Sequence, residues 1–328
     1  MEAAPLSENG KLFLADSLGY NGGAAGTNGG DSTERMRMGT TDVEGLAGHG
    51  RVPTAGNEER EEARTSHAPT VRPMRVPARH NETLSALVDR INADMEVQQL
   101  WKCANVTAAD RLGMTDHGPV HIRIVVNIAL RLLRLLGEAE VPFGVVRDYG
   151  LRPEDAEVVT VLAASLHDIG MSIHRKSHEQ FSLVLAAPLV RRLLAGLYDE
   201  PVLTIVTSET LHAIIAHRSD VQCLTAEAGC VKVGDALDMA EGRSRVPFEA
   251  GRIDMHSLSA AAIDSVTITR GHAKPIGIAV VMSNSAGMFQ LDQLLKPKLA
   301  SSGIQGYIEV TASIEGETER RLLPVYNL

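Results

Sequence analysis

Apolar side chains recur at helical spacing from about residue 82 onward. The first such run is Leu84, Leu87, Ile91 and Met95. Positions i, i+3, i+7 and i+11 share one face of a helix, so this run predicts an amphipathic helix. The same kind of spacing predicts further helices at about 119–137, 153–168, 202–217 and 227–241, with another from about 178. The first two thirds of the chain are therefore expected to be mainly α-helical.

Local signals set the expected ends of two of these helices. Gly170 is expected to cap the helix that ends near residue 168, because glycine is favoured just past a helix end. Ser177 and Gln180 have the spacing of a capping box, which predicts a helix start near His178. Pro188 lies inside that helix and is expected to kink or break it, because proline has no backbone N–H to donate.

The apolar pattern changes beyond residue 262. Strands are predicted at about 263–269, 276–280 and 306–313, with a helical stretch at about 288–300 and a final strand at 321–326. This order is β-β-α-β, so the fold class is a mainly α helical bundle followed by a small α+β unit.

Composition divides the chain into three predicted segments. Residues 1–80 are rich in Gly, Asn, Ser, Thr and charged side chains without an apolar period. Such a segment cannot bury enough surface to offset its ordering entropy, so it is predicted to be disordered and without a catalytic part. Residues 81–245 are predicted to form a helical domain and residues 246–328 a small α+β domain.

Charge and cysteine content exclude several classes of protein. The formal net charge of −9 argues against binding to a nucleic-acid duplex, which needs a basic surface. Cys103, Cys223 and Cys230 form no CxxC pair, as expected for thiols in a reducing cytosol. No apolar run approaches the roughly 20 residues that span a bilayer. We therefore expect a cytoplasmic protein that does not associate with membranes.

Histidines gather in the helical region together with acidic residues. Seven of the 12 histidines lie between His117 and His217, and His167 is followed directly by Asp168. The candidate metal ligands are His121, His167, Asp168, His178, His217 and Asp235. Helices of a bundle can direct such side chains to one centre. Imidazole and carboxylate together suit Mn, Fe, Zn, Co or Ni, with Mg less favoured.

Each candidate also has a structural explanation. His121 lies on an apolar helix face, where a lone histidine is usually a hydrogen-bonded core residue. His167 and Asp168 could cap a helix, and Asp235 with Asp238 could form a solvated helix edge. The spacing also leaves His212 and His217 open as alternatives. The candidates occur together, however, and a buried carboxylate needs a partner or a metal.

The order His121, His167-Asp168, Asp235 resembles the H…HD…D signature of the HD superfamily of metal-dependent phosphohydrolases. The strings that carry it are His-Ile-Arg-Ile-Val from 121, Leu-His-Asp-Ile-Gly from 166 and Val-Gly-Asp-Ala-Leu-Asp from 233. The resemblance covers about residues 117–242 and implies an HD-type helical bundle.

Members of this superfamily with two metals add two histidines between the His-Asp pair and the last aspartate. His178 and His217 match those places. The resemblance therefore implies a first metal on His121, His167, Asp168 and Asp235. It implies a second metal on His178 and His217, bridged to the first by the catalytic Asp168.

The cyclic-dinucleotide branch of the superfamily fits less well. It often carries lysine after the His-Asp-x-Gly string, where this chain has Met171, and a Gly-Tyr-Pro motif is missing after His217. A cyclic-di-GMP substrate is therefore not carried over.

Cationic side chains near the candidate ligands are expected to bind substrate phosphate. They are Lys176, Arg218, Arg243 and Arg245. A phosphohydrolase needs such charges to stabilise its transition state, and arginine is suited to bidentate phosphate contacts. Salt bridges in solvated loops are the alternative. Asp116 and His117 could orient a water molecule or support the ligands from outside, but for Asp116 a cap on the helix that starts near Pro119 is favoured.

The predicted function is metal-dependent hydrolysis of a phosphomonoester or phosphodiester, from a nucleotide or small metabolite, through a metal-bound hydroxide. The ligand set alone leaves two alternatives, an HD-type di-iron oxygenase and a non-catalytic nucleotide-binding regulator. The expected partner is a small phosphorylated substrate, and the C-terminal unit is a candidate homodimer interface.

Overall fold

The computed structural model describes residues 72–239 and 259–314. Contacts divide the chain into Met1–His67 and Ala68–Leu328, and every described residue belongs to the second unit. The strand predicted at 321–326, the boundary predicted between residues 245 and 246, and most of the segment predicted as disordered lie outside the described residues.

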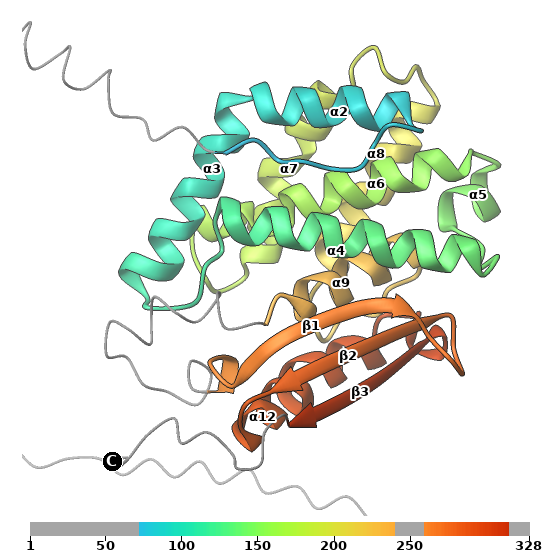
Figure 1. The fold of residues 1–328 in the computed structure, drawn as a ribbon. Coiled ribbons are helices and arrows are strands. Elements are labelled where there is room, and N and C mark those ends of the chain that lie inside the picture. The colour runs from blue at the N-terminus through green and yellow to red at the C-terminus, as the bar shows by residue number, and fades with distance from the viewer. Residues whose placement is uncertain (1–71, 240–258, 315–328) are drawn as a thin grey trace, which may run out of the picture. The chain divides into compact units, whose positions relative to one another are not determined.

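The described part of residues 82–239 is helical, as the apolar spacing predicts (Figure 1). Its α-helices are α2 (Glu82–Ala93), α3 (Met95–Asn105), α4 (Pro119–Glu138), α5 (Gly144–Tyr149), α6 (Pro153–Leu166), α7 (His178–Leu194), α8 (Val202–Ala216) and α9 (Ala226–Leu237). Helix α6 is mostly apolar and is buried along nearly its whole length, including the polar side chains of Asp155 and Glu157, so it forms the centre of the bundle. Within the described residues, no helix has both the length and the apolar character to cross a bilayer.

The first predicted helix is interrupted, which the apolar spacing does not reveal. Asp94 ends α2, and its Oδ1 accepts hydrogen bonds from the backbone N–H groups of Glu96 and Val97 at the start of α3. Met95, which we expected on the buried face, is 75% exposed. A strong N-cap residue therefore outweighs the apolar spacing at this point.

Local signals around α7 were partly misread. The helix starts at His178 as predicted, but Ser177 has a φ of 64° and its side chain makes no capping hydrogen bond. Pro188 lies inside α7, which continues to Leu194. Gly170 does not cap α6, which ends at Leu166. It lies in the short 3-10 helix 169–172, where a Cβ would be 2.0 Å from the carbonyl oxygen of His178.

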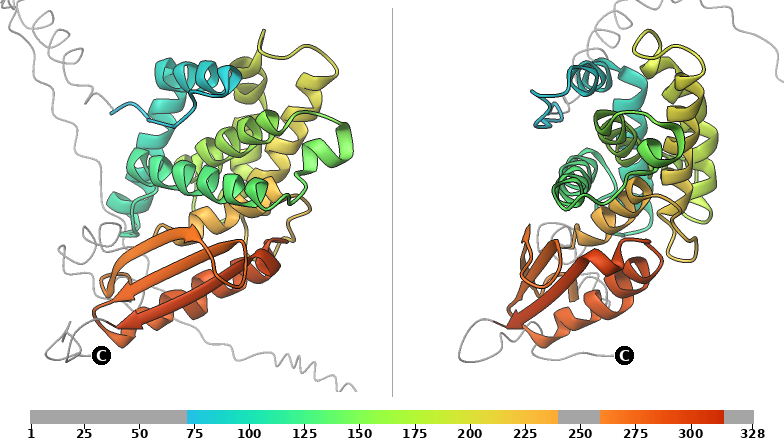
Figure 2. Two further views of the ribbon diagram at one scale, coloured as in Figure 1. Left: turned by 45° about the vertical axis from the view of Figure 1, so that its right-hand side comes forward. Right: turned by 90° about the vertical axis from the view of Figure 1, so that its right-hand side faces the viewer.

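The C-terminal unit has the predicted β-β-α-β order. Strands β1 (Ile263–Arg270) and β2 (Ile276–Met282) are antiparallel, and β3 (Ile308–Ile314) pairs with β2 in parallel. A helical segment between β2 and β3 includes α12 (Met288–Gln290) and α13 (Lys296–Ala300). Figure 2 shows this segment along one face of the sheet. The mainly α fold with a small C-terminal α+β unit is therefore confirmed.

Helix α9 lies between the bundle and the C-terminal unit (Figure 1). It packs against α4 on one side and against α13 on the other. One apolar core cluster contains residues of both parts, for example Leu132 of α4, Val231 of α9 and Ile278 of β2. Because the two parts share this core, the C-terminal unit is close enough to contribute to a site in the bundle.

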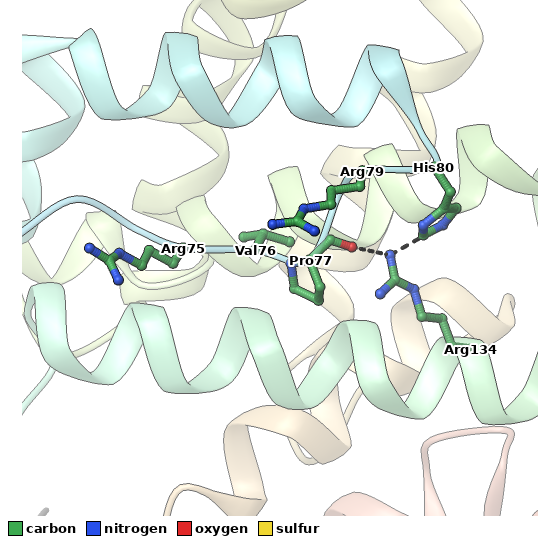
Figure 3. A pocket seen from close by; sticks show the side chains of 6 residues that line it. All are labelled: Arg75, Val76, Pro77, Arg79, His80 and Arg134. Carbon is green, nitrogen blue, oxygen red and sulfur yellow. Dashed lines mark hydrogen bonds between the residues drawn. The ribbon is translucent and has the colours of Figure 1, made fainter.

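Residues 72–80 pack across α4 and α6 and form a charged contact there. Figure 3 shows Arg134 of α4 below this segment, where it donates a 2.8 Å hydrogen bond to the carbonyl oxygen of Pro77. Arg134 Nε also donates to Glu157 Oε1 at 2.7 Å, and Asn81 Nδ2 donates to Glu157 Oε2 at 3.0 Å. His80 Nε2 lies 3.1 Å from Glu157 Oε1. We call these four side chains the Glu157 cluster.

Candidate metal centre

The ends of several helices bring the predicted ligands together. His167 and Asp168 follow the last residue of α6, His178 begins α7 and His217 follows α8. The remaining two are His121 in the first turn of α4 and Asp235 in the last turn of α9. All six side chains are buried.

His121, His167 and Asp235 form one group of inward-facing ligand atoms. His121 Nε2 lies 3.4 Å from Asp235 Oδ1, and His167 Nε2 lies 3.8 Å from the same oxygen. Asp168 Oδ2 completes the group, at 3.4 Å from Nε2 of both histidines. Ligand atoms held about 2.1 Å from one ion lie about 3–3.5 Å apart, so this group has nearly the spacing of a coordination site.

Asp168, His178 and His217 form a second group. His178 Nε2 lies 3.2 Å from Asp168 Oδ1 and 3.4 Å from His217 Nε2. His217 Nε2 lies 3.6 Å from the same oxygen of Asp168. The two oxygens of Asp168 thus face different groups, which is the arrangement of a carboxylate that bridges two ions.

The outer nitrogens of the histidines are held by acceptors that point their Nε2 atoms inward. Nδ1 of His167 lies 2.9 Å from the carbonyl oxygen of Ala164, and Nδ1 of His217 lies 2.5 Å from that of Ile214. His121 is also fixed through its backbone, because Asp116 Oδ2 accepts from its N–H at 3.0 Å. Such outer contacts set the tautomer and ring orientation of ligating histidines. The N-cap residue of α4 is Gly118 rather than the predicted Asp116, although Asp116 accepts hydrogen bonds from the backbone N–H groups of Gly118 and His121.

The donor set fits a divalent cation. His167 Nε2 is buried and makes no hydrogen bond to the described residues, although carboxylate oxygens lie 3.4 and 3.8 Å away. Buried polar atoms in native proteins nearly always have a partner, so this nitrogen points to a group that the polypeptide does not supply. A cation between imidazole nitrogens and carboxylates is such a group.

Electrostatics favour the ligating protonation states of Asp168, Asp235 and His217, whereas contact with Asp168 raises the pKa of His178 despite its burial. Burial alone would raise the pKa of Asp168, but the charge of His167 and contact with His121 hold it well below its usual range. Burial would also raise the pKa of Asp235, and the ammonium group of Lys298 outweighs this effect and lowers it. Burial lowers the pKa of His217, which favours the neutral imidazole that a metal requires.

The choice between His212 and His217, which spacing leaves open, is decided by packing. His217 faces Asp168 and His178. The Nε2 of His212 instead accepts a hydrogen bond from the backbone N–H of Leu224 at 3.1 Å. His212 therefore holds the loop that leads into α9.

A cavity of about 830 Å³ is lined by two of the four predicted phosphate-binding residues, Lys176 and Arg218. Arg218 also donates two 2.7 Å hydrogen bonds to Asp220. It therefore both lines the cavity and forms a salt bridge, which was the alternative to phosphate binding. Arg175 also lines this cavity, and its Nη1 lies 2.9 Å from His178 Nδ1, which connects the cavity to the second group. Arg243 and Arg245 lie outside the described residues.

Two residues that touch the centre are not among the predicted ligands. Asp238 Oδ2 lies 2.6 Å from His121 Nδ1, so Asp238 is not the solvated helix edge that we considered. The position of Asp238 one helical turn after Asp235 could have indicated that it also faces the centre. Lys298 of α13 donates to Asp235 Oδ2. No local pattern pointed to Lys298, which is 63 residues away from Asp235 in the chain.

Comparison with known proteins agrees with this geometry. The model of the HD domain family matches residues 120–240, which contain all six clustered side chains. The uncharacterized protein MJ1020 of Methanocaldococcus jannaschii is 41% identical over 231 residues, which is 70% of this chain and 89% of that protein. No solved structure gives a significant match. The chain therefore belongs to the HD superfamily, whose members are generally metal-dependent phosphohydrolases.

Proposed function

We propose that this protein is a metal-dependent phosphohydrolase that cleaves a phosphomonoester or phosphodiester of a nucleotide or small metabolite. The observation that carries the proposal is the position of Asp168, whose two oxygens face two separate groups of ligand atoms. A site for two ions of this kind is typical of enzymes that hydrolyse phosphoesters. Membership of the HD superfamily points the same way.

The six clustered side chains have distinct roles in this proposal. His121, His167 and Asp235 would hold a first divalent ion, and His178 and His217 would hold a second. Asp168 would contact both ions. Two such ions activate a water molecule and neutralise phosphoryl oxygens. The protein fixes the ligands in place beforehand through the contacts to their outer nitrogens and through burial.

The cavity beside the second group is the proposed substrate site. Arg175, Lys176 and Arg218 would bind the phosphate oxygens, because guanidinium and ammonium groups stabilise the negative charge of a phosphoryl group. Arg218 is held by Asp220, so its orientation is set before the substrate binds. Leu112 and Met114 line the same cavity and offer an apolar surface to the rest of the substrate.

The experiment is a phosphoester panel on metal-stripped protein reloaded separately with Mn, Co, Ni, Fe, Zn or Mg. We expect hydrolysis of at least one ester class by the reloaded protein and loss of activity in Asp168→Asn. Asp155→Asn is the matched control, because Asp155 is equally buried but binds Arg152 and Tyr198 away from the centre. Wild-type turnover in Asp168→Asn would contradict the proposed site.

The same protein preparation separates the alternatives. Two tightly bound irons with oxygen consumption and no ester hydrolysis would replace this proposal with an oxygenase. Tight nucleotide binding without turnover under any metal would replace it with a non-catalytic regulator.

A further inference from the structure

One face of α9 meets the end of the helical segment in the C-terminal unit. Gly229, Lys232 and Asp235 follow each other at intervals of three residues, so they lie along one side of the helix. The residues that face them are Ser302, Ser301 and Lys298, in that order. The segment therefore runs along α9 in a fixed register, and the metal centre lies at its Lys298 end.

The register is fixed by a buried polar anchor. Lys232 is fully buried, and its Nζ donates to Ser301 Oγ at 2.8 Å and to the carbonyl oxygen of Val221. The carbonyl oxygen of Ser301 also accepts from the backbone N–H of Cys223 at 2.9 Å. A buried lysine left without these acceptors would be costly, so this contact holds the segment firmly.

Close backbone approach adds to the anchor. A Cβ at position 229 would lie 2.4 Å from the carbonyl oxygen of Ser302, so only glycine permits this contact. Ser301 and Ser302 are thus pressed against α9 directly after α13. Because Lys298 lies one helical turn before Ser301, the anchor also fixes the backbone position of Lys298.

At the other end of this contact, Lys298 reaches a candidate ligand. Its ammonium group donates to Oδ2 of Asp235, while Oδ1 of the same carboxylate faces His121 at 3.4 Å. The side chain of Lys298 is 18% exposed and that of Asp235 is 11% exposed. The two oxygens of Asp235 therefore have separate partners, one in the bundle and one in the C-terminal unit.

We propose that Lys298 is a positioning residue of the metal centre, and that the C-terminal unit supplies it as an integral part of that centre. An unrestrained carboxylate rotates and can bind an ion through both oxygens. The ammonium group on Oδ2 restricts Asp235 to a single ligating oxygen, which is directed at the first group. This inference rests on the metal-holding role proposed for Asp235, and it is independent of the substrate.

The test is titration of metal-stripped, full-length protein with Mn²⁺, measured by calorimetry. Removing a residue that orients a ligand typically costs about 10- to 100-fold in metal affinity, so Lys298→Met is expected to weaken the tighter Mn²⁺ site by that factor. Lys298→Arg keeps the charge and is expected to bind Mn²⁺ more tightly than Lys298→Met, because a guanidinium can still donate to Asp235. Lys296→Met is the matched control, since Lys296 lies on the same helix but is 78% exposed and pairs with Asp292.

Thermal melting separates positioning from folding. We expect Lys298→Met to remain folded and to lose Mn²⁺ affinity. Its metal-free melting temperature should lie below that of Lys296→Met, because Asp235 loses a partly buried cationic partner, so the titration is run well below that temperature. Wild-type Mn²⁺ affinity in folded Lys298→Met overturns the inference, and so does equal loss in Lys298→Arg. Should Lys298→Met fail to fold, Lys298→Gln takes its place beside Lys298→Arg. Equal Mn²⁺ affinity in Lys298→Gln and Lys298→Arg overturns the inference. Wild-type-like Mn²⁺ affinity in Lys298→Arg alone supports it.

The Mn²⁺ titration also keeps this inference apart from the proposed function. If the wild-type protein binds Mn²⁺ but hydrolyses no phosphoester, the proposed function is wrong. The role of Lys298 is then still decided by comparing the Mn²⁺ affinities of wild type and the Lys298 variants. Where turnover is found, kcat of Lys298→Met is expected to fall with KM nearly unchanged, because Lys298 does not line the substrate cavity.

Discussion

The metal centre and the Glu157 cluster both place carboxylates in the protein interior. They differ in how far protein hydrogen bonds satisfy the buried polar atoms around them. Both oxygens of Glu157 accept hydrogen bonds, one from Arg134 and the other from Asn81. In the metal centre, His167 Nε2 is buried and makes no hydrogen bond to the described residues. A buried carboxylate with protein donors on both oxygens stabilises the fold, whereas a buried polar atom without a hydrogen bond points to a ligand.

The same helix carries both regions. Glu157 lies near the start of α6, and His167 and Asp168 follow its last residue. Both carboxylates are buried at the two ends of one mostly apolar helix, so composition alone does not separate a structural carboxylate from a candidate ligand. What separates them is what the neighbouring helices present. α4 brings Arg134 to Glu157 and His121 to Asp168.

The largest difference between the two regions is expected in metal binding. Asp168→Asn should reduce bound metal from about two ions per chain to less than one and lower turnover at least about 100-fold, because Asp168 faces both groups. Glu157→Gln should leave metal content unchanged. Elemental analysis of both purified variants measures this, and a full metal complement in Asp168→Asn would remove the basis of the comparison.

Asp238 should have the next largest effect. Asp238→Asn weakens the contact to Nδ1 of His121 and is expected to lower metal affinity or turnover by about 10- to 100-fold. Asp155→Asn again serves as the control, and metal titration with steady-state kinetics gives the numbers. Wild-type behaviour in both assays would show that His121 is oriented without Asp238.

A smaller effect, on folding alone, is expected for Glu157. Glu157→Gln leaves Arg134 without its anionic partner, and Arg134 is only 25% exposed. Removing one partner from a fully buried ion pair costs about 3–5 kcal/mol, and the partial exposure of Arg134 reduces this to about 1–3 kcal/mol. Urea unfolding of metal-free protein measures the change. An unfolding free energy equal to that of wild type would show that the Glu157 cluster contributes as little to stability as a surface salt bridge.

The finest distinction is in pH dependence. Burial would raise the pKa of Glu157, but Arg134 and Asn81 outweigh it and lower this pKa. A carboxyl group with a lowered pKa in the folded state stabilises the protein above its unfolded pKa, near 4.3, and loses this contribution as the pH falls further. The stability difference between wild type and Glu157→Gln should therefore be constant above about pH 5 and shrink below that. Urea unfolding between pH 7 and pH 3.5 measures it, and a constant difference over that range would contradict the assignment.

Much of the helical architecture could be predicted from local patterns, with errors where a local signal competed with apolar spacing. The ends of α4 and α8 are predicted to within a residue or two, because their apolar runs are long and Pro119 favours the first turn of α4. The break at Asp94 was missed, since a capping carboxylate contributes nothing to an apolar period. Gly170 was correctly singled out but for the wrong reason, because its role is a close approach to α7.

The sequence by itself determined the fold class and the family, because helical and alternating periods and the order of His121, His167-Asp168 and Asp235 are properties of the chain alone. Only the tertiary structure decided which groups complete the centre. It brought His217 rather than His212 to Asp168, Asp238 to His121, and Lys298 to Asp235. The last two contacts join residues 117 and 63 positions apart. Such contacts depend on how helices and the sheet pack, and no local spacing encodes that packing.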